Sequence, residues 1–187
     1  MFILYAIPIG IVAGLLGGGR LEGVGAIRLR WVPLMLLGLL LQLAIFTDAV
    51  GRLVGDAGPA IYIASTTAVF IAVLRNVAVP GVGLIAAGAA CNLAAIVANG
   101  GWMPADAAAL ASVGGLKDGY TNSIVVGDPA LRALTDVFAL PAWLPLSNVF
   151  SIGDVLIGAG IALTIALAMR DAGRMARADE PAPATHL

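Results

Sequence analysis

The sequence predicts an all-α protein: a polytopic membrane helix bundle of about five transmembrane helices, with a structured outer loop that contains short helices. Composition indicates a membrane protein, because 60% of the 187 residues are hydrophobic and only 11% are charged. Soluble domains are about 45–50% apolar and about 25% charged. In addition, the chain contains several apolar segments whose lengths are close to the ~20 residues that a helix needs to cross a bilayer.

The apolar segments follow one another through polar connections. They are residues 2–18, 32–47, 59–74, 80–98 and 149–169. The first has no basic residue before it and no A-x-A-like site after it, so we interpret it as a retained helix rather than a cleaved signal. Small residues at four-residue spacing in the first and fourth segments favour close helix packing. They are Gly10 and Gly14, and the series Gly83, Ala87, Cys91, Ala95 and Asn99.

Positive charge is concentrated on one side of the predicted bundle. One side carries Arg20, Arg28, Arg30, Arg75, Arg170, Arg174 and Arg177, and the other carries Arg52, Lys117 and Arg132. Basic residues are enriched in cytoplasmic connections. We therefore expect a bacterial inner (plasma) membrane protein with its N-terminus outside and its C-terminus in the cytoplasm. Residues 1–170 are expected to form a single membrane domain, and residues 171–187 a disordered cytoplasmic tail.

Several function classes are disfavoured by the charged and metal-binding residues. The net charge is −1 and no dense basic tract occurs, so no nucleic acid is expected as a partner. Cys91 and His186 are the only cysteine and histidine, which excludes the usual zinc, haem and iron–sulfur ligand patterns. We expect neither a cofactor nor a metal, although a carboxylate-held magnesium or calcium ion stays open in principle.

The connection over residues 99–148 is long and rich in apolar residues, and we expect it to be a folded outer loop. Two short helices are predicted within it. "PADAAALAS" has Pro104 in its first turn, and "PALRALTDVF" follows Asp128 as an N-cap. The second should end before Pro141, leaving "LPAWLPLSN" as an extended strap.

Two aspartates near the last segment are the candidate catalytic residues. Asp154 is the one acidic residue within a predicted span, where a charge costs up to ~2.5–3.5 kcal/mol. Asp154 either faces a polar site or caps the helix, because Ser151 to Asp154 resembles a capping box. Asp136 alone would be an ordinary solvated acid. As a close pair the two would share a proton, with Asp154 as the base and Asp136 as the acid.

Polar and aromatic neighbours are the candidate substrate-binding residues. They are Asn99, Trp102, Asn148 and Ser151. Asn92 lies on the same helix face as Asn99, and the two either link helices or line the site with the aspartates. We expect an extracytoplasmic pocket that binds or processes an amphiphilic lipid or peptide substrate. The alternative is a non-catalytic subunit or assembly partner of a larger membrane complex, so whether the protein is an enzyme stays open. Membrane lipid, and a membrane-protein partner or a second copy of the chain, are the expected partners.

Four stretches carry a resemblance that covers most of the chain. "ANGGWMP" (98–104), "GYTNS" (119–123), "DVFALP" (136–141) and "NVFSIGDVLI" (148–157) resemble a family of small bacterial membrane proteins of unknown function. The resemblance spans essentially the whole membrane portion and implies five helices, but it implies no activity.

A second, local resemblance concerns the aspartates. Asp-Val-Phe, a proline-rich stretch and an Asn-led segment that ends in Asp are similar to the catalytic end of lipoprotein signal peptidase, an intramembrane aspartic peptidase. This resemblance implies that Asp136 and Asp154 form a catalytic dyad. The chain departs from that family in its helix number and in the shorter gap between its aspartates.

Overall fold

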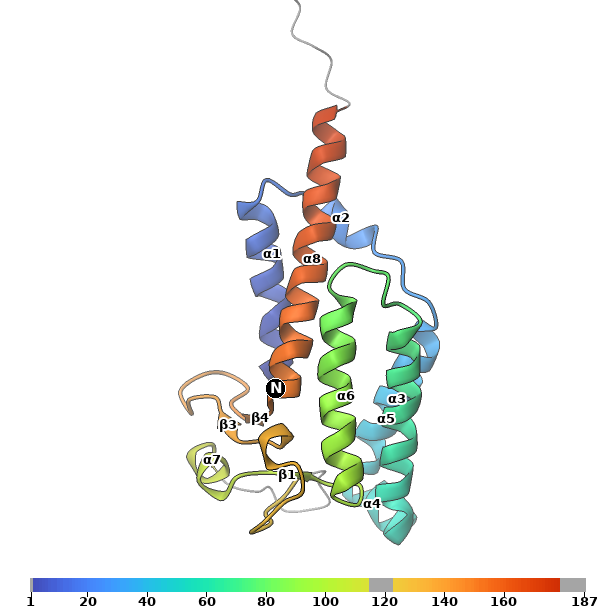
Figure 1. Ribbon diagram of the computed structural model, residues 1–187, viewed down its shortest axis with the longest axis vertical. Coiled ribbons are helices and arrows are strands. Elements are labelled where there is room, and N and C mark those ends of the chain that lie inside the picture. Colours follow the sequence, from blue (N-terminus) through green and yellow to red (C-terminus); the bar gives the residue numbers. More distant parts are fainter. Residues whose placement is uncertain (1, 115–122, 179–187) are drawn as a thin grey trace, which may run out of the picture.

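The computed structural model describes residues 2–114 and 123–178, and this part of the chain is mostly helical (Figure 1). The longer helices are α1 (Ala6–Leu16), α3 (Val32–Ile45), α4 (Asp48–Val54), α5 (Gly58–Leu74), α6 (Val82–Ala98) and α8 (Ile152–Ala178). The short elements are η1 (Phe2–Tyr5), α2 (Glu22–Gly25), η2 (Gly55–Ala57), β1 (Met103–Pro104), α7 (Ala107–Ser112), β2 (Ser123–Ile124), η3 (Arg132–Leu134), β3 (Phe138–Ala139) and β4 (Val149–Phe150).

Each of the predicted apolar segments is helical, as α1, α3, α5, α6 and α8. Among the described residues, two helical stretches are long and apolar enough to cross a membrane, Ala49–Leu74 and Ile152–Ala178. The remaining apolar helices, Phe2–Leu16, Val32–Ile45 and Val82–Ala98, are shorter. The sequence therefore predicted the helices correctly. Length and apolar composition together identify two helical stretches as candidate membrane spans, one of which combines α4, η2 and α5.

The helices pack in the order α1, α8, α6, α5, α3, with α8 between α1 and α6 (Figure 1). Glycines allow the close contacts of α8. A methyl group added at Gly10 of α1 would lie 2.8 Å from the carbonyl oxygen of Ala162 in α8. On α6 the contact is made at Gly88, where an added methyl group would lie 2.3 Å from the carbonyl oxygen of Gly153. The predicted series on this helix begins at Gly83, which faces open space.

The last helix is longer than the sequence predicted, because α8 continues to Ala178 and residues 171–178 are helical. An ion pair between Arg174 and Asp171, at 3.2 Å, stabilises the added turns from one side. The guanidinium of Arg177 donates to the carbonyl oxygen of Gly18 at 2.8 Å, which ties them to the chain after α1. The remainder of the expected tail, residues 179–187, lies outside the described residues.

One of the two predicted loop helices forms and the other does not. Helix α7 begins after Asp106, whose carboxylate accepts from two backbone N–H groups of the first turn, rather than at Pro104. The predicted helix over 129–138 is wrong, because only the short η3 is helical and Leu131 has a φ of 53°. The backbone N–H of Asp136 instead donates to the carbonyl oxygen of Pro104 at 2.9 Å, which holds this segment extended.

The predicted strap, residues 140–148, folds back so that the strands on either side of it pair. Strand β3 pairs with β4 in antiparallel register, and the backbone N–H of Leu140 donates to the carbonyl oxygen of Asn148 at 3.0 Å. Phe150 stacks on Phe138 with ring centroids 5.5 Å apart, and on Phe2 with centroids 4.3 Å apart. This pairing brings the segment with Asp136 to the N-terminal end of α8.

Candidate functional site

Reciprocal hydrogen bonds between Ser151 and Asp154 close the first turn of α8. The hydroxyl of Ser151, at the N-cap position, accepts from the backbone N–H of Asp154 at 3.1 Å. The carboxylate of Asp154 accepts from the backbone N–H of Ser151, also at 3.1 Å. These two bonds make a capping box, and they place the carboxylate at the positive end of the helix dipole. Asp154 thus has the geometry of a helix cap.

A side chain from α6 joins this turn. The Nδ2 group of Asn92 donates to Oδ1 of Asp154 at 2.8 Å. The hydroxyl of Ser151 donates to Oδ1 of Asn92, also at 2.8 Å. Together with the two capping bonds, which use the backbone N–H groups of Ser151 and Asp154, these bonds close a ring that links Asn92, Ser151 and Asp154, and Ser151 is fully buried in it. The sequence offered Asn92 as a helix link or a pocket-lining residue, and the structure makes it the direct partner of Asp154.

The ring requires an unusually close approach of α6 and α8. A methyl group added at Gly153 would lie 1.9 Å from Oδ1 of Asn92 and 2.7 Å from the carbonyl oxygen of Gly88. Real Cβ atoms do not approach that closely, so a side chain at Gly153 would push α6 away. Glycine at this position is what allows Asn92 to reach the first turn of α8.

Asp136 belongs to the outer loop and is held there by its backbone. Its N–H donates to the carbonyl oxygen of Pro104 at 2.9 Å, and its carbonyl oxygen accepts from the backbone N–H of Asp106 at 3.0 Å. Side chains alternate sides along an extended chain, and Thr135 and Val137 line a cavity of about 180 Å³ in the loop. The side chain of Asp136 therefore lies on the other side, and it is only 7% exposed.

The charge of Asp154 acts on Asp136. Burial raises the pKa of Asp136 to about 7, and repulsion from the Asp154 carboxylate contributes to the rise. Among the described residues, no hydrogen bond to the Asp136 carboxylate lowers its pKa again. The Asp154 carboxylate, by contrast, accepts from both Asn92 and the Ser151 backbone. The raised pKa of Asp136 makes it a proton donor near neutral pH, within electrostatic reach of the Asp154 carboxylate.

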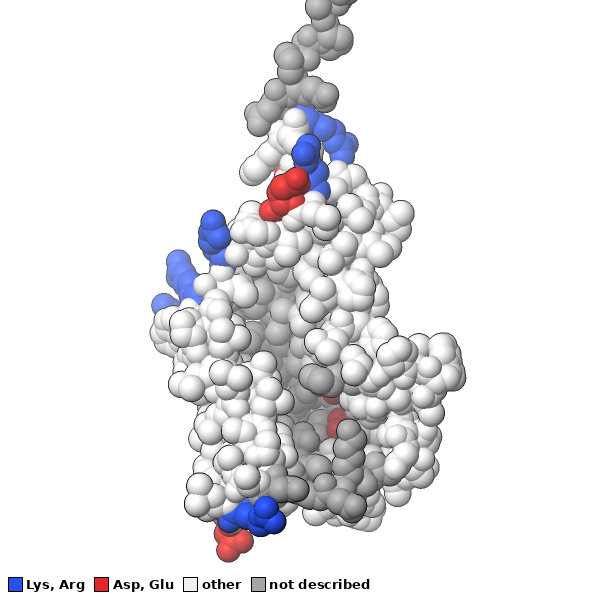
Figure 2. All heavy atoms as spheres, turned by 180° about the vertical axis from the view of Figure 1, so that it is seen from behind, with Lys and Arg blue, Asp and Glu red and all other residues white. Residues whose placement is uncertain are grey.

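The space-filling view places acidic atoms in a recess. Figure 2 shows them at the bottom of a hollow on this face. In such a recess, a neutral acid can donate a proton to a carbonyl group, and a carboxylate near it can accept a proton from water. Within the part of the chain that the structure describes, no group of three or more His, Cys, Asp or Glu residues could hold a metal ion.

The other predicted substrate-binding residues serve different contacts. Asn99 accepts from the N–H of Ala130 at 3.0 Å and donates to its carbonyl oxygen at 2.9 Å, which clamps the loop to the end of α6. Asn148 accepts from the backbone N–H of Phe2 at 3.0 Å. Trp102 is half-buried just before β1. Neither amide hydrogen-bonds to Asp136 or Asp154 in the described residues, whereas Ser151 hydrogen-bonds to Asp154.

The fold and the site define a class: a mostly helical protein in which a folded loop buries one aspartate beside the capped start of the last helix. The chain belongs to a family of unknown function, DUF5317, whose model matches residues 26–166. The match includes Asn92, Asp136 and Asp154 but begins after α1, so it is narrower than the resemblance expected from the sequence. No curated protein and no solved structure matches the chain. The resemblance to lipoprotein signal peptidase stays a prediction.

Proposed function

We propose that this protein is a five-helix protein of a bacterial inner membrane, and that its outer pocket binds or processes an amphiphilic lipid or peptide substrate through Asp136 and Asp154. Exposed apolar surface supports the membrane placement. Six leucines of α3 are 40–64% exposed, which is too much contiguous apolar surface for contact with water. They are Leu36, Leu37, Leu39, Leu40, Leu41 and Leu43. Lipid tails would cover this face.

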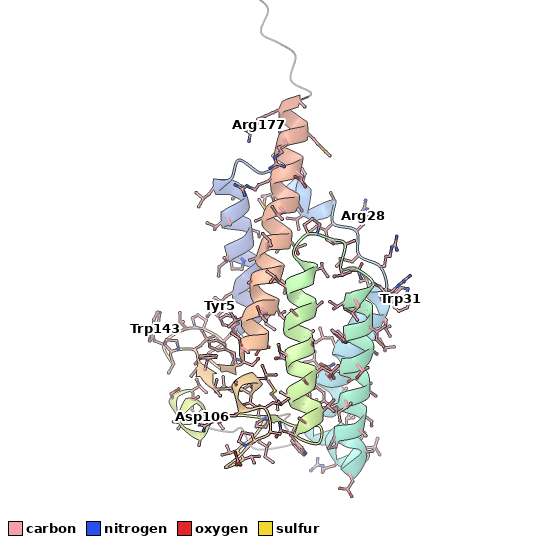
Figure 3. The ribbon with its side chains drawn as sticks, viewed as in Figure 1. Tyr5, Arg28, Trp31, Asp106, Trp143 and Arg177 are labelled. Atoms are coloured by element: carbon pink, nitrogen blue, oxygen red, sulfur yellow. The ribbon has the colours of Figure 1, made fainter. Side chains whose placement is uncertain are left out.

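Charge supports the proposed orientation. Figure 2 shows basic residues gathered near the C-terminal end of α8, a middle surface almost without charge, and a small charged group at the opposite end. Basic residues favour the cytoplasmic side, so the end of α8 would face the cytoplasm and the loop with Asp136 the outside. Trp143, in the strap, is 81% exposed and extends away from the helices (Figure 3). An exposed tryptophan there suits an anchor at the outer membrane surface.

Helix length fits a thin bilayer. The 14 residues of α3 rise by about 21 Å, whereas a typical hydrocarbon core is about 30 Å thick. Local thinning or extension by flanking residues would accommodate the difference at modest energetic cost.

One observation carries the functional proposal: Asp136 is buried, and the Asp154 carboxylate adds to the rise of its pKa. Burial of a carboxyl without compensating hydrogen bonds is unfavourable, and folding alone does not require it. Strongly perturbed carboxyls are concentrated at functional sites. Asp136 would act as the acid and Asp154 as the base on a substrate that enters from the outer membrane surface.

The capping box favours a second candidate function. Because Ser151 and Asn92 already satisfy Asp154, this residue has a sufficient structural role at the start of α8. The protein would then be a non-catalytic subunit or assembly partner of a larger membrane complex, which its helix surfaces would contact.

A comparison of variants separates the two functions. The full chain, purified in nanodiscs, is incubated with a total membrane-lipid extract and with membrane peptides, and bound and converted species are identified by mass spectrometry. Asp136→Asn should abolish binding or conversion, whereas Asp106→Asn, a change at a half-buried residue of the same loop, should not.

If Asp136→Asn and Asp154→Asn fold normally and keep both the conversion and the cellular phenotype, the catalytic proposal is wrong. A stoichiometric protein partner that co-purifies equally with the wild type and both variants would support the subunit function instead.

A further inference from the structure

A cavity of about 270 Å³ lies at the opposite end of the molecule from the aspartates. It is bounded by α2 and the residues after it, by the turn before α6 and by the C-terminal half of α8, and it is partly open to the surface. We propose that this cavity binds one anionic phospholipid of the cytoplasmic leaflet. The part of an acyl chain nearest the headgroup would lie inside the cavity, and the phosphate would lie at its mouth. The proposal rests on the membrane placement proposed above, but it is independent of the aspartate pair.

The walls of the cavity are held in place by close contacts. A methyl group added at Gly23 of α2 would lie 2.2 Å from the carbonyl oxygen of Ala168, so α2 rests directly on α8. On the other side, the hydroxyl of Thr164 donates to the carbonyl oxygen of Pro80 at 2.9 Å. The cavity between these contacts is preformed, which lowers the entropic cost of binding.

The lining changes from apolar to charged along α8. The helix contributes residues at three- and four-residue spacing, so they share one face. They are Thr164, Leu167, Ala168, Asp171, Ala172 and Met175. From Thr164 to Met175 the face covers about 17 Å along the axis. Leu167 and Ala168 precede the charged Asp171, so the chemistry is that of a site for an amphiphile rather than for a free ion.

Arg28 and Asp171 are the charged residues that line the cavity. Among the described residues, the guanidinium of Arg28 donates to the carbonyl oxygen of Gly25 at 3.3 Å. Within the described residues Arg28 has no ion pair, whereas Asp171 is paired with Arg174 at 3.2 Å. Figure 3 places Arg28 at the same end as Arg177. Basic pockets between membrane helices on the cytoplasmic side bind anionic headgroups, so a lipid phosphate complements Arg28.

Native mass spectrometry of the full chain tests this site. The protein in detergent is titrated with phosphatidylglycerol and, separately, with phosphatidylcholine of the same acyl chains. The wild type should retain one phosphatidylglycerol in preference to phosphatidylcholine. Arg28→Gln should weaken phosphatidylglycerol binding about fivefold and weaken phosphatidylcholine binding less, because the choline group offsets the charge of its phosphate. Arg30→Gln, the matched control two residues away and outside the cavity, should stay within about twofold of the wild type.

A second variant tests the acyl chain. Ala172→Phe fills the cavity and should weaken binding of both lipids, and sn-glycerol 3-phosphate should not displace phosphatidylglycerol. Equal weakening by Arg28→Gln and Arg30→Gln would overturn the proposal, because it would show diffuse surface attraction. Unchanged binding by Ala172→Phe, or displacement by sn-glycerol 3-phosphate, would overturn it too. Asp136→Asn should bind phosphatidylglycerol like the wild type, which keeps this test separate from that of the aspartates.

Discussion

Replacement of Asp136 with asparagine should stabilise the protein at pH 8. Burial, together with repulsion from Asp154, raises the pKa of Asp136 from 3.8 to about 7. Between these values the folded protein keeps a proton that the unfolded chain has released, so the free energy of unfolding falls as the pH rises and levels off above about 7. Between pH 5 and 8 the loss corresponds to about two pKa units, or ~3 kcal/mol.

The assay is the free energy of unfolding by steric trapping in dodecyl maltoside, from pH 5 to pH 8. The wild type should lose stability over this range, and Asp136→Asn should lack that loss. Asp106→Asn is the control: backbone hydrogen bonds lower the pKa of this carboxyl, so it does not titrate here and the variant should keep the wild-type slope. A wild type whose stability is flat or rises with pH, or an Asp136→Asn variant that keeps the slope, would refute the reasoning.

Two further predictions concern the contacts around the site. Gly153→Ala would place a methyl group 1.9 Å from Oδ1 of Asn92 and should cost ~1–3 kcal/mol of stability. Gly158→Ala, whose nearest heavy atom is 3.4 Å away, should be nearly neutral, and equal losses in thermal unfolding would contradict the close approach. Asn99→Ala removes both hydrogen bonds to Ala130 and should speed proteolysis of the outer loop; unchanged cleavage would show that the clamp is unimportant.

The apolar helices were predictable because long uninterrupted apolar runs specify them locally. The loop was less so. Asp128 and Pro129 are a sound local signal for a helix start, yet the helix over 129–138 does not form. The backbone of Asp136 pairs instead with Pro104 and Asp106, which are distant in sequence. Tertiary hydrogen bonds thus outweigh the propensity of a short segment.

The residue types of the candidate site were predictable, but not which residue of α6 would meet Asp154. Asn92 and Asn99 lie on one face of α6, and both were plausible neighbours of the aspartates. The contact between Gly88 and Gly153 fixes the height at which α6 meets α8. At that height Asn92 reaches Asp154, while Asn99 is left for the loop. The spacing within one helix cannot reveal such a docking height.

The most direct test of the aspartate pair is the pKa of Asp136, measured by ¹³C NMR of labelled aspartate carboxyls in nanodiscs and assigned with Asp136→Asn. The pair predicts a pKa of about 7 in the wild type. It predicts a lower value in Asp154→Asn, still above 3.8 because burial, the larger cause, remains. A pKa near 3.8 in the wild type, or one that Asp154→Asn leaves unchanged, would contradict the account.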